Sequence, residues 1–412
     1  MTAMEKKDKT LNVPNLRFPE FSGEWEKELL GTTCNVLMCK RILASQTNAE
    51  CGVPFYKIGT IGGIPDAYIS KELFESYRAK YNYPRKGEVM ITCAGTVGKA
   101  MIFDGEDSYY QDSNIVWIDN PTNKIDNTFL YHFISKVDWS KLNTTTIVRI
   151  YNDDLRQLRI SYPTLSEQRK ISIFLNLLNQ RIETQKKIIE DLKKLKDAIA
   201  EKLFCAPEEE SPELRIVNSS DRWISYRLKD VCQRVSERNS QGLSSLVLTI
   251  AAQYGLVSQT DFFNKSVASE NLSNYYLIQK GDFAYNKSYS REYVWGAVKR
   301  LELYEKGVLS PLYICFRPNP LIVNSDFLSH YFETHKWHNG IAQIAGEGAR
   351  NHGLLNVSIS DYFATLHRLP GLAEQKKIAS YLNLLSDKIS LANKELKCYS
   401  SQKQYLLARM FI

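Results

Sequence analysis

The sequence lacks any long apolar run. Its first residues, MTAMEKKDKT, are charged and contain no apolar core of the secretory type. No later stretch reaches the roughly 20 consecutive apolar residues that a membrane-spanning helix needs. With 43% hydrophobic and 24% charged residues the composition is that of a folded chain, and 412 residues favour two or more domains. We therefore expect a globular, cytoplasmic protein.

Motifs for catalysis and metal binding are also missing. The eight cysteines form no C-x-x-C pair, which excludes the common zinc spacings and predicts mostly buried thiols in a reducing compartment. His335 and His338 have no third ligand at a zinc-enzyme spacing. The segment AGTVGKA resembles a phosphate-binding loop, but Cys93 replaces its first glycine and Ala100 replaces the hydroxyl residue that binds magnesium. We interpret this segment as a tight turn between two strands, and we expect no enzyme activity, metal or cofactor in this chain.

The excess of positive charge is local. Of the net charge of +7, residues 166–204 carry +3, from nine basic and six acidic side chains, and residues 372–412 carry +4, from seven and three. The remaining chain is formally neutral. A nucleic-acid surface outside these two segments would therefore be a local patch rather than a general field.

A long internal repeat is the strongest feature. Residues 165–182, LSEQRKISIFLNLLNQRI, return as residues 372–389, LAEQKKIASYLNLLSDKI, with ten of eighteen positions identical. The offset between the copies is 198 residues early in each copy, as for Trp25 and Trp223, and 207 residues later, so the second copy carries 207 − 198 = 9 extra residues. This period is too long for a solenoid, and each copy is expected to hold a whole domain.

Each copy changes character once. A first part, rich in Val, Ile, Tyr, Phe and Thr and broken by Gly, Pro, Asn and Asp, predicts a mixed α/β (α+β) domain. A helical part follows it. The fold class we expect is thus two tandem α/β domains, each followed by a long α-helix. The predicted boundaries are an N-terminal tail at 1–18, a first domain at 19–164, a long helix at 165–206, a linker at 207–220, a second domain at 221–371 and a second long helix at 372–412.

Apolar residues recur every seven positions through both helical parts, as in a coiled coil. Five heptads make each helix about 55 Å long. We predict that the two helices pair as an intramolecular antiparallel coiled coil with pseudo-twofold symmetry, because the chain keeps their effective concentration high. An ordinary packed helix pair with no further role is the alternative. The predicted seam residues are Leu175, Leu178, Ile182, Ile189, Leu192, Ile199, Leu382, Leu385, Ile389, Leu396, Tyr399 and Leu406.

Several stretches together resemble one protein family. They are VPNLRFPEFSGEWEKELLG, GTVGKAMIFD and DDLRQLRISYPTLSEQRKISIFL in the first copy, and GEGARNHGLLNVSISDYF and LPGLAEQKKIASYL in the second. In this order they look like the DNA-specificity subunit of type I restriction-modification enzymes, over essentially the whole chain. The motif P-x-L-x-E-Q-x-K-I that closes each domain is the most specific part. The sequence departs from the family at YPTL and LPGL, where the family often has paired prolines.

The resemblance implies a non-catalytic subunit. Each domain would be a target recognition domain that reads one half of a bipartite double-stranded DNA site, while the helices set the gap and dock two modification subunits. S-adenosylmethionine would belong to those methyltransferase partners, and ATP and magnesium to the restriction subunits, of which two would complete the enzyme. No membrane partner is implied.

Residues that contact DNA are expected in loops where the copies differ. Arg and Lys suit phosphate and guanine, and Asn, Gln, Ser, Thr and Tyr suit base edges. For each single residue, a solvated loop position is an equal alternative. The candidates are Lys57, Thr96, Lys99, Thr144, Thr145, Arg149, Tyr151, Asn152, Gln253, Tyr254, Lys287, Ser288, Tyr289, Arg291, Arg350, Asn351 and His352.

Two other functions remain open from the sequence. A two-headed scaffold for protein partners would use the same duplicated layout without DNA specificity. A self-contained nuclease or methyltransferase is disfavoured by the missing motifs.

Overall fold

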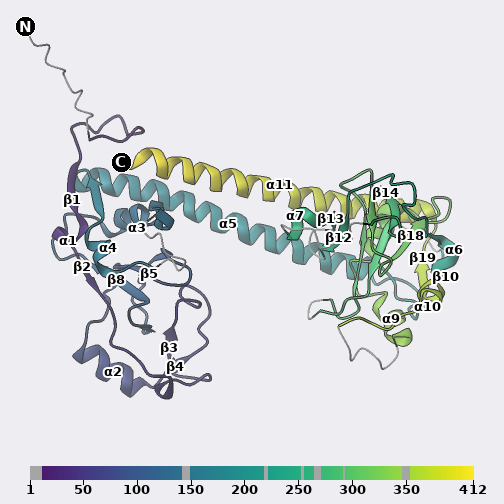
Figure 1. Cartoon of the computed structure of the whole chain (residues 1–412), viewed down its shortest axis with the longest axis horizontal. Helices are drawn as coiled ribbons and strands as arrows, with labels where there is room; N and C mark the ends of the chain where they lie inside the picture. The colour runs from purple at the N-terminus through teal and green to yellow at the C-terminus, as the bar shows by residue number, and fades with distance from the viewer. Residues whose placement is uncertain are drawn as a thin grey trace, which may run out of the picture. The chain divides into compact units, whose positions relative to one another are not determined.

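The chain folds into two compact units (Figure 1). Unit 1 comprises Met1–Lys186 with Glu395–Ile412, and unit 2 comprises Lys187–Lys394. The helices α5 (Leu165–Leu203) and α11 (Leu372–Met410) each contribute one part to each unit. The computed structural model describes residues 12–141, 149–217, 221–251, 255–263, 271–290, 293–345 and 353–412.

Unit 1 is built on an antiparallel sheet with strand order β2-β8-β5-β6. A smaller sheet, β4-β3-β7, pairs β3 with β7 in parallel, and β1 pairs with β9 as a separate ribbon. The described strands are β1 (Glu26–Leu29), β2 (Asn35–Leu37), β3 (Val53–Tyr56), β4 (Tyr68–Ile69), β5 (Val89–Thr92), β6 (Ala100–Ile102), β7 (Tyr109–Tyr110), β8 (Ile115–Asp119) and β9 (Arg159–Tyr162). The short helices are α1 (Leu30–Thr33), α2 (Lys71–Lys80), α3 (Asn127–Lys136), α4 (Asn152–Arg156) and the 3-10 turns η1 (Ala44–Gln46) and η2 (Trp139–Lys141).

The central strands of unit 1 are buried on both faces. Along β5, Val89 and Ile91 point into the cluster that also holds α3 and the long helices, while Met90 points into the cluster beside β7. This alternation is the two-residue period of a strand. Because both faces of the sheet are covered, β5 and β8 are apolar at nearly every position.

Unit 2 repeats the plan with the sheet β11-β18-β15-β16. On β15, Phe283 and Tyr285 face the cluster of the long helices and Ala284 faces the opposite cluster. The ribbons β12-β13, β14-β17 and β10-β19 complete the described sheets. The strands are β10 (Ile224–Arg227), β11 (Cys232–Arg234), β12 (Leu248–Ala251), β13 (Gly255–Ser258), β14 (Tyr276–Gln279), β15 (Phe283–Asn286), β16 (Ala297–Arg300), β17 (Lys306–Leu309), β18 (Ile314–Pro318) and β19 (Leu366–Leu369). The short helices are α6 (Leu228–Val231), α7 (Gln259–Phe263), α8 (Ser325–Tyr331), α9 (His338–Ile344) and α10 (Ile359–Ala364).

The end of one long helix packs beside the beginning of the other within each unit. In unit 1, Leu175 of α5 shares a buried cluster with Leu406 and Met410 of α11. In unit 2, Leu203 of α5 shares a buried cluster with Leu382 of α11. All twelve predicted seam residues are buried or half-buried.

The mixed α/β fold class and the long C-terminal helix are confirmed. Among the described residues, no helix is both long enough and apolar enough to span a membrane. Six cysteines are buried, and the thiols of Cys51 and Cys398 are exposed. Burial raises the pKa of the Cys93 thiol to about 12, so this thiol is protonated and unreactive at neutral pH.

Candidate nucleic-acid interface

The turn that joins β5 and β6 carries two of the predicted contact residues, Thr96 and Lys99. Its geometry depends on Thr92, whose hydroxyl donates to the Thr96 carbonyl and accepts from Lys99 N at 3.0 Å. Gly98 has a φ of +82°, and a Cβ there would lie 2.0 Å from the Trp139 ring. AGTVGKA is therefore a tight turn between two strands, as predicted, and Gly98 is required by backbone conformation and by space.

The loop after β3 lies against this turn. Lys99 Nζ donates to the Ile61 carbonyl at 2.6 Å, and Lys57 Nζ at the loop's start pairs with Asp66 at its end, 3.0 Å apart. The structure therefore brings Lys57, Thr96 and Lys99 together. The Lys99 ammonium group is already hydrogen-bonded to protein, which the sequence did not indicate.

The segment before α4 joins the same surface. Ile150 N donates to the Cys93 carbonyl at 2.9 Å, which fixes this segment beside the β5–β6 turn. The guanidinium of Arg149 lies 5.8 Å from the centre of the Tyr151 ring, and Tyr151 is 60% exposed. Asn152 follows as the first residue of α4. Thr144 and Thr145 lie outside the described residues.

Unit 2 forms a surface at the corresponding place. There the turn between β15 and β16 runs over 287–296, ten residues instead of the seven at 93–99. The Lys287 carbonyl accepts from Leu355 N at 2.9 Å, and Tyr289 N donates to the Gly353 carbonyl at 2.7 Å. These bonds bring together two stretches that the sequence analysis selected separately. Tyr289 is 52% exposed, and Ser288 bridges to Leu354. Gln253, Tyr254, Arg291, Arg350, Asn351 and His352 lie outside the described residues.

Each unit thus presents a turn of its central sheet and a second segment joined to that turn by backbone hydrogen bonds. Exposed lysine, hydroxyl and aromatic groups on such a surface suit phosphate oxygens and base edges. Within the described ranges, no group of three or more His, Cys, Asp and Glu side chains has the arrangement of a metal site.

The sequence did not predict a set of polar contacts at the start of each long helix. In unit 1, Arg17 makes a two-pronged ion pair with Glu167, at 2.8 and 2.7 Å, and the hydrogen bond to Glu167 raises the pKa of the guanidinium. The Gln168 amide bridges the α3 N-terminus and the chain before α5: it accepts from Asp126 N at 2.7 Å and donates to the Pro163 carbonyl at 2.7 Å.

The same contacts recur in unit 2. Arg215 pairs with Glu374, and Gln375 bridges Asn324 N and the Pro370 carbonyl at 2.7 and 2.8 Å. We call these sets the joints of the two units. The joint of unit 1 is Arg17, Asp126, His132, Glu167, Gln168, Asn176 and Phe411, and that of unit 2 is Arg215, Asn324, His330, Glu374, Gln375, Asn383 and Phe204. Each member of one joint aligns with a member of the other under an offset of 198 or 207 residues. Polar residues matched at these offsets were therefore the signal in the sequence that could have identified the joints.

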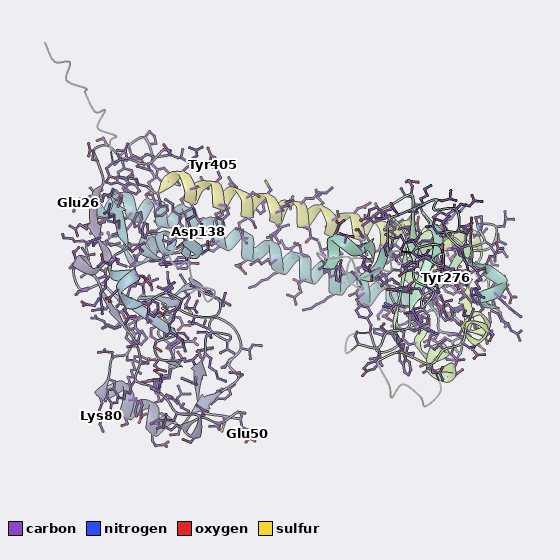
Figure 2. The ribbon with its side chains drawn as sticks, in the orientation of Figure 1. Glu26, Glu50, Lys80, Asp138, Tyr276 and Tyr405 are labelled. Carbon is purple, nitrogen blue, oxygen red and sulfur yellow. The ribbon has the colours of Figure 1, made fainter. Side chains whose placement is uncertain are left out.

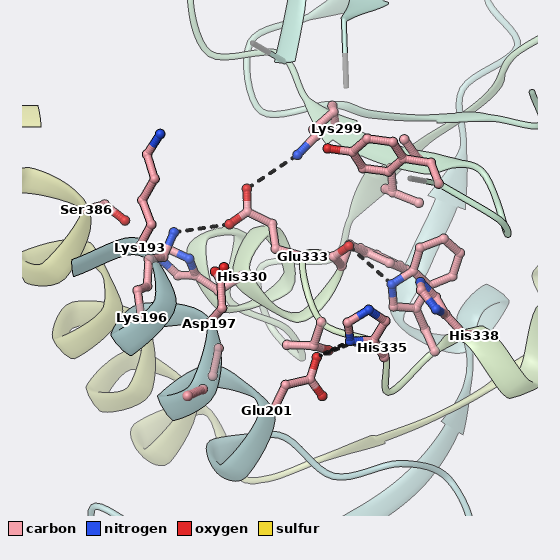
Figure 3. Close-up of a pocket in the computed structure, with 18 of the residues that line it drawn as sticks. Lys193, Lys196, Asp197, Glu201, Lys299, His330, Glu333, His335, His338 and Ser386 are labelled. Carbon is pink, nitrogen blue, oxygen red and sulfur yellow. Dashed lines mark hydrogen bonds and ion pairs between the residues drawn. The ribbon is translucent and has the colours of Figure 1, made fainter. Parts of the chain in front are cut away.

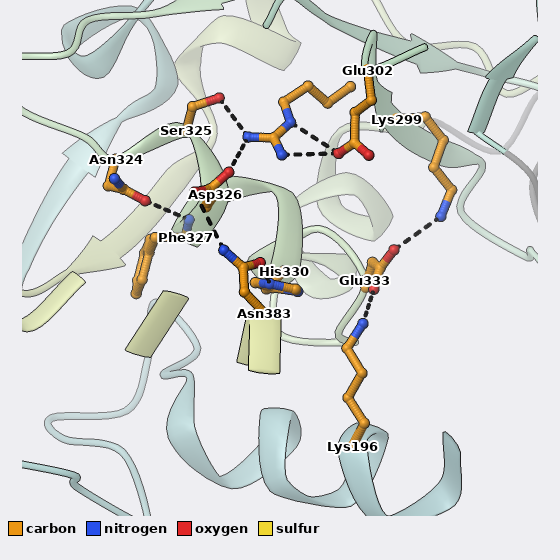
Figure 4. Close-up of polar contacts among 11 residues, drawn as sticks. Lys196, Lys299, Glu302, Asn324, Ser325, Asp326, Phe327, His330, Glu333 and Asn383 are labelled. Carbon is orange, nitrogen blue, oxygen red and sulfur yellow. Dashed lines mark hydrogen bonds and ion pairs between the residues drawn. The ribbon is translucent and has the colours of Figure 1, made fainter. Parts of the chain in front are cut away.

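A buried histidine lies in each joint. His132 Nε2 lies 3.0 Å from Asn176 Oδ1, and His330 Nε2 lies 2.8 Å from Asn383 Oδ1, as Figure 4 shows for unit 2. Burial lowers the pKa of His132 to about 4 and also lowers that of His330. Both are neutral at physiological pH and serve packing rather than proton transfer.

Exposed apolar residues recur at matched positions on the two long helices. Phe174 and Leu177 of α5 are 38% and 59% exposed, and their counterparts Tyr381 and Leu384 of α11 are 40% and 67% exposed. Residues three apart are neighbours on a helix surface. We call each pair the exposed stripe of its helix.

Comparisons with known proteins agree with these features. Residues 22–194 match the family model of the type I restriction modification DNA specificity domain. A putative type I restriction enzyme specificity subunit of Haemophilus influenzae is 54% identical over 142 residues. That match covers 34% of this chain and 37% of the relative, so the chain spans little more than a third of the curated relative that it matches.

Solved structures extend the likeness in fold. The S subunit of the type I restriction-modification system from M. genitalium superposes with a TM-score of 0.54 at 16% identity, over 97% of this chain and 99% of that chain. A chain from a structure concerned with complex assembly and conformational transition of the type I R-M system gives the same TM-score and identity, over 94% and 97%. The resemblance to type I specificity subunits expected from the sequence is confirmed, and it rests on the match of residues 22–194 to the model of their DNA specificity domain.

Proposed function

We propose that this chain supplies DNA sequence specificity to a type I restriction-modification enzyme and performs no catalysis itself. The observation that carries the proposal is the match of residues 22–194 to the DNA specificity domain. It is supported by a surface in each unit that presents Lys, Thr, Tyr and Arg side chains on a turn held by backbone bonds. The methyl donor, ATP and magnesium would be bound by partner subunits.

The duplication leads to a division of the target. We propose that each unit reads one half of a bipartite site in double-stranded DNA, because both units present a surface at the same place in their folds while the lengths of the turns differ. Different turns on one framework would read different bases, and each correct base pair would add about 1–3 kcal/mol.

Sequencing of methylated adenines tests this directly. The chain is assembled with its modification partner and offered a random duplex library. We expect one two-part target sequence. Exchanging residues 20–160 for those of a relative should change one half of the target and leave the other half unchanged. If every duplex were methylated equally, the proposal would be wrong.

A single-residue test uses the surface of unit 1. Replacing Arg149 by Ala should weaken binding to the cognate duplex by about 1–3 kcal/mol and relax selectivity in one half-site only. Lys80 at the end of α2 is the control, since it is an exposed cation of the same unit that lies well away from Asp138 (Figure 2). Asp138 precedes Trp139, whose ring lies against Gly98 of the β5–β6 turn. Lys80→Ala should leave both halves of the target unchanged.

The long helices would set the gap between the half-sites. Each is 39 residues long, and their heptad seam predicts pairing along its length. Inserting one heptad into each helix would add about 10 Å, or about three base pairs, to the gap. An unchanged gap in the mapped target would contradict this spacer role.

The exposed stripes are where we propose that two modification subunits dock. Two equivalent apolar patches suit two copies of one partner, and they are placed on elements that the DNA-reading turns do not use.

The cytoplasmic location expected from the sequence remains a prediction.

A scaffold that bridges protein partners without DNA specificity is the second candidate, and the exposed stripes favour it equally. Salt separates the two, because DNA binding through phosphates weakens steeply with ionic strength. Partner assembly with no salt-sensitive DNA binding would favour the scaffold.

A further inference from the structure

Unit 2 contains a cavity of about 900 Å³ between α5, α11, β16 and the segment around α8 and α9 (Figure 3). Its volume falls within the range of roughly 300–1,000 Å³ typical of small-molecule sites. Its lining is unusually charged. The ionisable lining residues are Lys193, Lys196, Asp197, Glu201, Lys299, His330, Glu333, His335 and His338.

Two ammonium groups on one side of the cavity flank a single carboxylate, and a third lysine on the same side points away from it (Figure 3). Glu333 lies 3.1 Å from Lys196 Nζ and 3.5 Å from Lys299 Nζ, and these lysine side chains are only 15% and 18% exposed. Lys193 lies one helical turn before Lys196, and within the described part of the chain no carboxylate lies within ion-pair distance of it. We call Lys193, Lys196 and Lys299 the basic corner. It holds more positive than negative charge.

Carboxylates occupy the next turn of α5. Glu201 accepts from the backbone N of His335 at 2.7 Å. Burial raises the pKa of Asp197, with Glu333 and Glu201 adding to the effect against Lys196. The cavity therefore has a cationic side and a side that offers hydrogen-bond acceptors.

The first copy of the repeat shows that the fold does not need these charges. Unit 1 closes its joint in the same way, and of the basic corner it keeps only the lysine equivalent to Lys196, which is Lys403. Burying charged side chains costs desolvation free energy that an ion pair often fails to recover. The counterparts of Lys193, Asp197, Glu201, Lys299, Glu333, His335 and His338 are Ser400, Gln404, Ala408, Met101, Ser135, Val137 and Ser140.

We propose that the basic corner binds the phosphate group of a nucleotide, with Asp197 accepting a hydrogen bond from a sugar hydroxyl or a base amino group. Lysine ammonium groups bind phosphate as point charges. Glu333 holds Lys196 and Lys299 in place through its two ion pairs, and it would compete with the phosphate for them. The phosphate would come from a free nucleotide or from the backbone of DNA. The inference does not depend on the proposed DNA specificity, because the free nucleotide is tested on this chain alone.

Two substitutions that copy unit 1 should have opposite effects. The full chain is titrated calorimetrically with adenosine 5′-monophosphate, and separately with duplex DNA at low salt. Lys299→Met should weaken binding by about tenfold or more, as expected for loss of a charge-assisted contact. Glu333→Ser should tighten binding by about threefold to tenfold, because the competing carboxylate is gone. Lys280→Met, at an exposed pair with Glu305, is the control and should change nothing.

The two ligands identify the source of the phosphate. Opposite shifts with the mononucleotide support a free nucleotide, and opposite shifts with the duplex alone support the DNA backbone. The inference is overturned if neither ligand responds to the two substitutions, or if both substitutions change affinity in the same direction. Misfolding cannot imitate the result, since a tighter-binding Glu333→Ser variant must be folded.

Discussion

The joints of the two units are alike in their aromatic contacts. In unit 1 the Phe411 ring, just after α11, lies 4.9 Å from Phe129 of α3, and in unit 2 the Phe204 ring, just after α5, lies 4.9 Å from Phe327 of α8. Each long helix therefore ends against the domain that the other copy of the repeat supplies. Because this aromatic contact occurs in both joints, we infer that the fold requires it.

The units differ in the layer behind these rings. Unit 2 has a hydrogen-bonded set in which His367 lies 3.0 Å from the Tyr331 hydroxyl and 2.8 Å from the Thr365 hydroxyl. Unit 1 has apolar side chains at all three places, which are Phe133, Leu158 and Ile160. A satisfied polar set and an apolar set fill equivalent space, as expected when every buried polar group finds a partner.

The largest effect should come from removing the shared aromatic contact. Phe204→Ala and Phe411→Ala should each lower the free energy of unfolding by about 3–5 kcal/mol, since both rings are buried. Denaturant unfolding of the full chain measures this. Leu312→Ala, at a residue that is 67% exposed, is the control and should cost less than about 0.5 kcal/mol. A small effect at one ring only would mean that the joints are not equivalent.

The loss of stability at low pH should also differ between the two units. Burial lowers the pKa of His338 and His367 in unit 2 to about 4 and lowers that of His330, while His132 is the corresponding group in unit 1. The unfolded chain takes up these protons more readily, so the stabilisation is present above about pH 6.5 and is lost as the pH falls toward 4. Unit 2 should therefore unfold first on acidification, as measured by hydrogen exchange.

A triple substitution sharpens the acid comparison. Tyr331→Phe, Thr365→Leu and His367→Ile together give unit 2 the side chains of unit 1. This variant should retain about 2–3 kcal/mol more of its stability between pH 6.5 and pH 4 than the wild type. If its pH dependence matched that of the wild type, His367 would not be a source of acid sensitivity.

Breaking the matched ion pairs should have an intermediate effect. Glu167 and Glu374 are 1% and 8% exposed, and each is neutralised by one arginine. Arg17→Met and Arg215→Met should each cost about 1–3 kcal/mol, because a buried carboxylate loses its partner. Adding Glu167→Gln to the first variant, or Glu374→Gln to the second, should recover part of the loss. Thermal unfolding measures the stability of the four variants. If the second substitution recovers no stability, the unpaired carboxylate is not the cause of the loss.

The sequence predicted the periodic features well and the tertiary ones poorly. The sequence predicted long helices at 165–206 and 372–412, and α5 (Leu165–Leu203) and α11 (Leu372–Met410) begin at those positions, because heptads and the preceding prolines are local signals. It did not show that Phe204 and Phe411 pack on the domain of the other copy, which depends on tertiary pairing. Similarly, residue type and loop position predicted Lys57 and Lys99 as DNA contacts. The sequence did not show that the Lys99 ammonium group donates to the carbonyl of Ile61, which lies 38 residues away along the chain.

The smallest effect on stability, and the most selective one on assembly, should come from the exposed stripes. Leu177→Ser and Leu384→Ser change side chains that are 59% and 67% exposed, so each should alter the free energy of unfolding by less than about 0.5 kcal/mol. If each stripe docks one modification subunit, either substitution alone should remove one partner copy and the double variant both, as counted by native mass spectrometry. Leu195→Ser, at an α5 residue that is 49% exposed and outside the stripe, is the control and should retain both copies. Loss of both partners from a single substitution would show that the two stripes form one site.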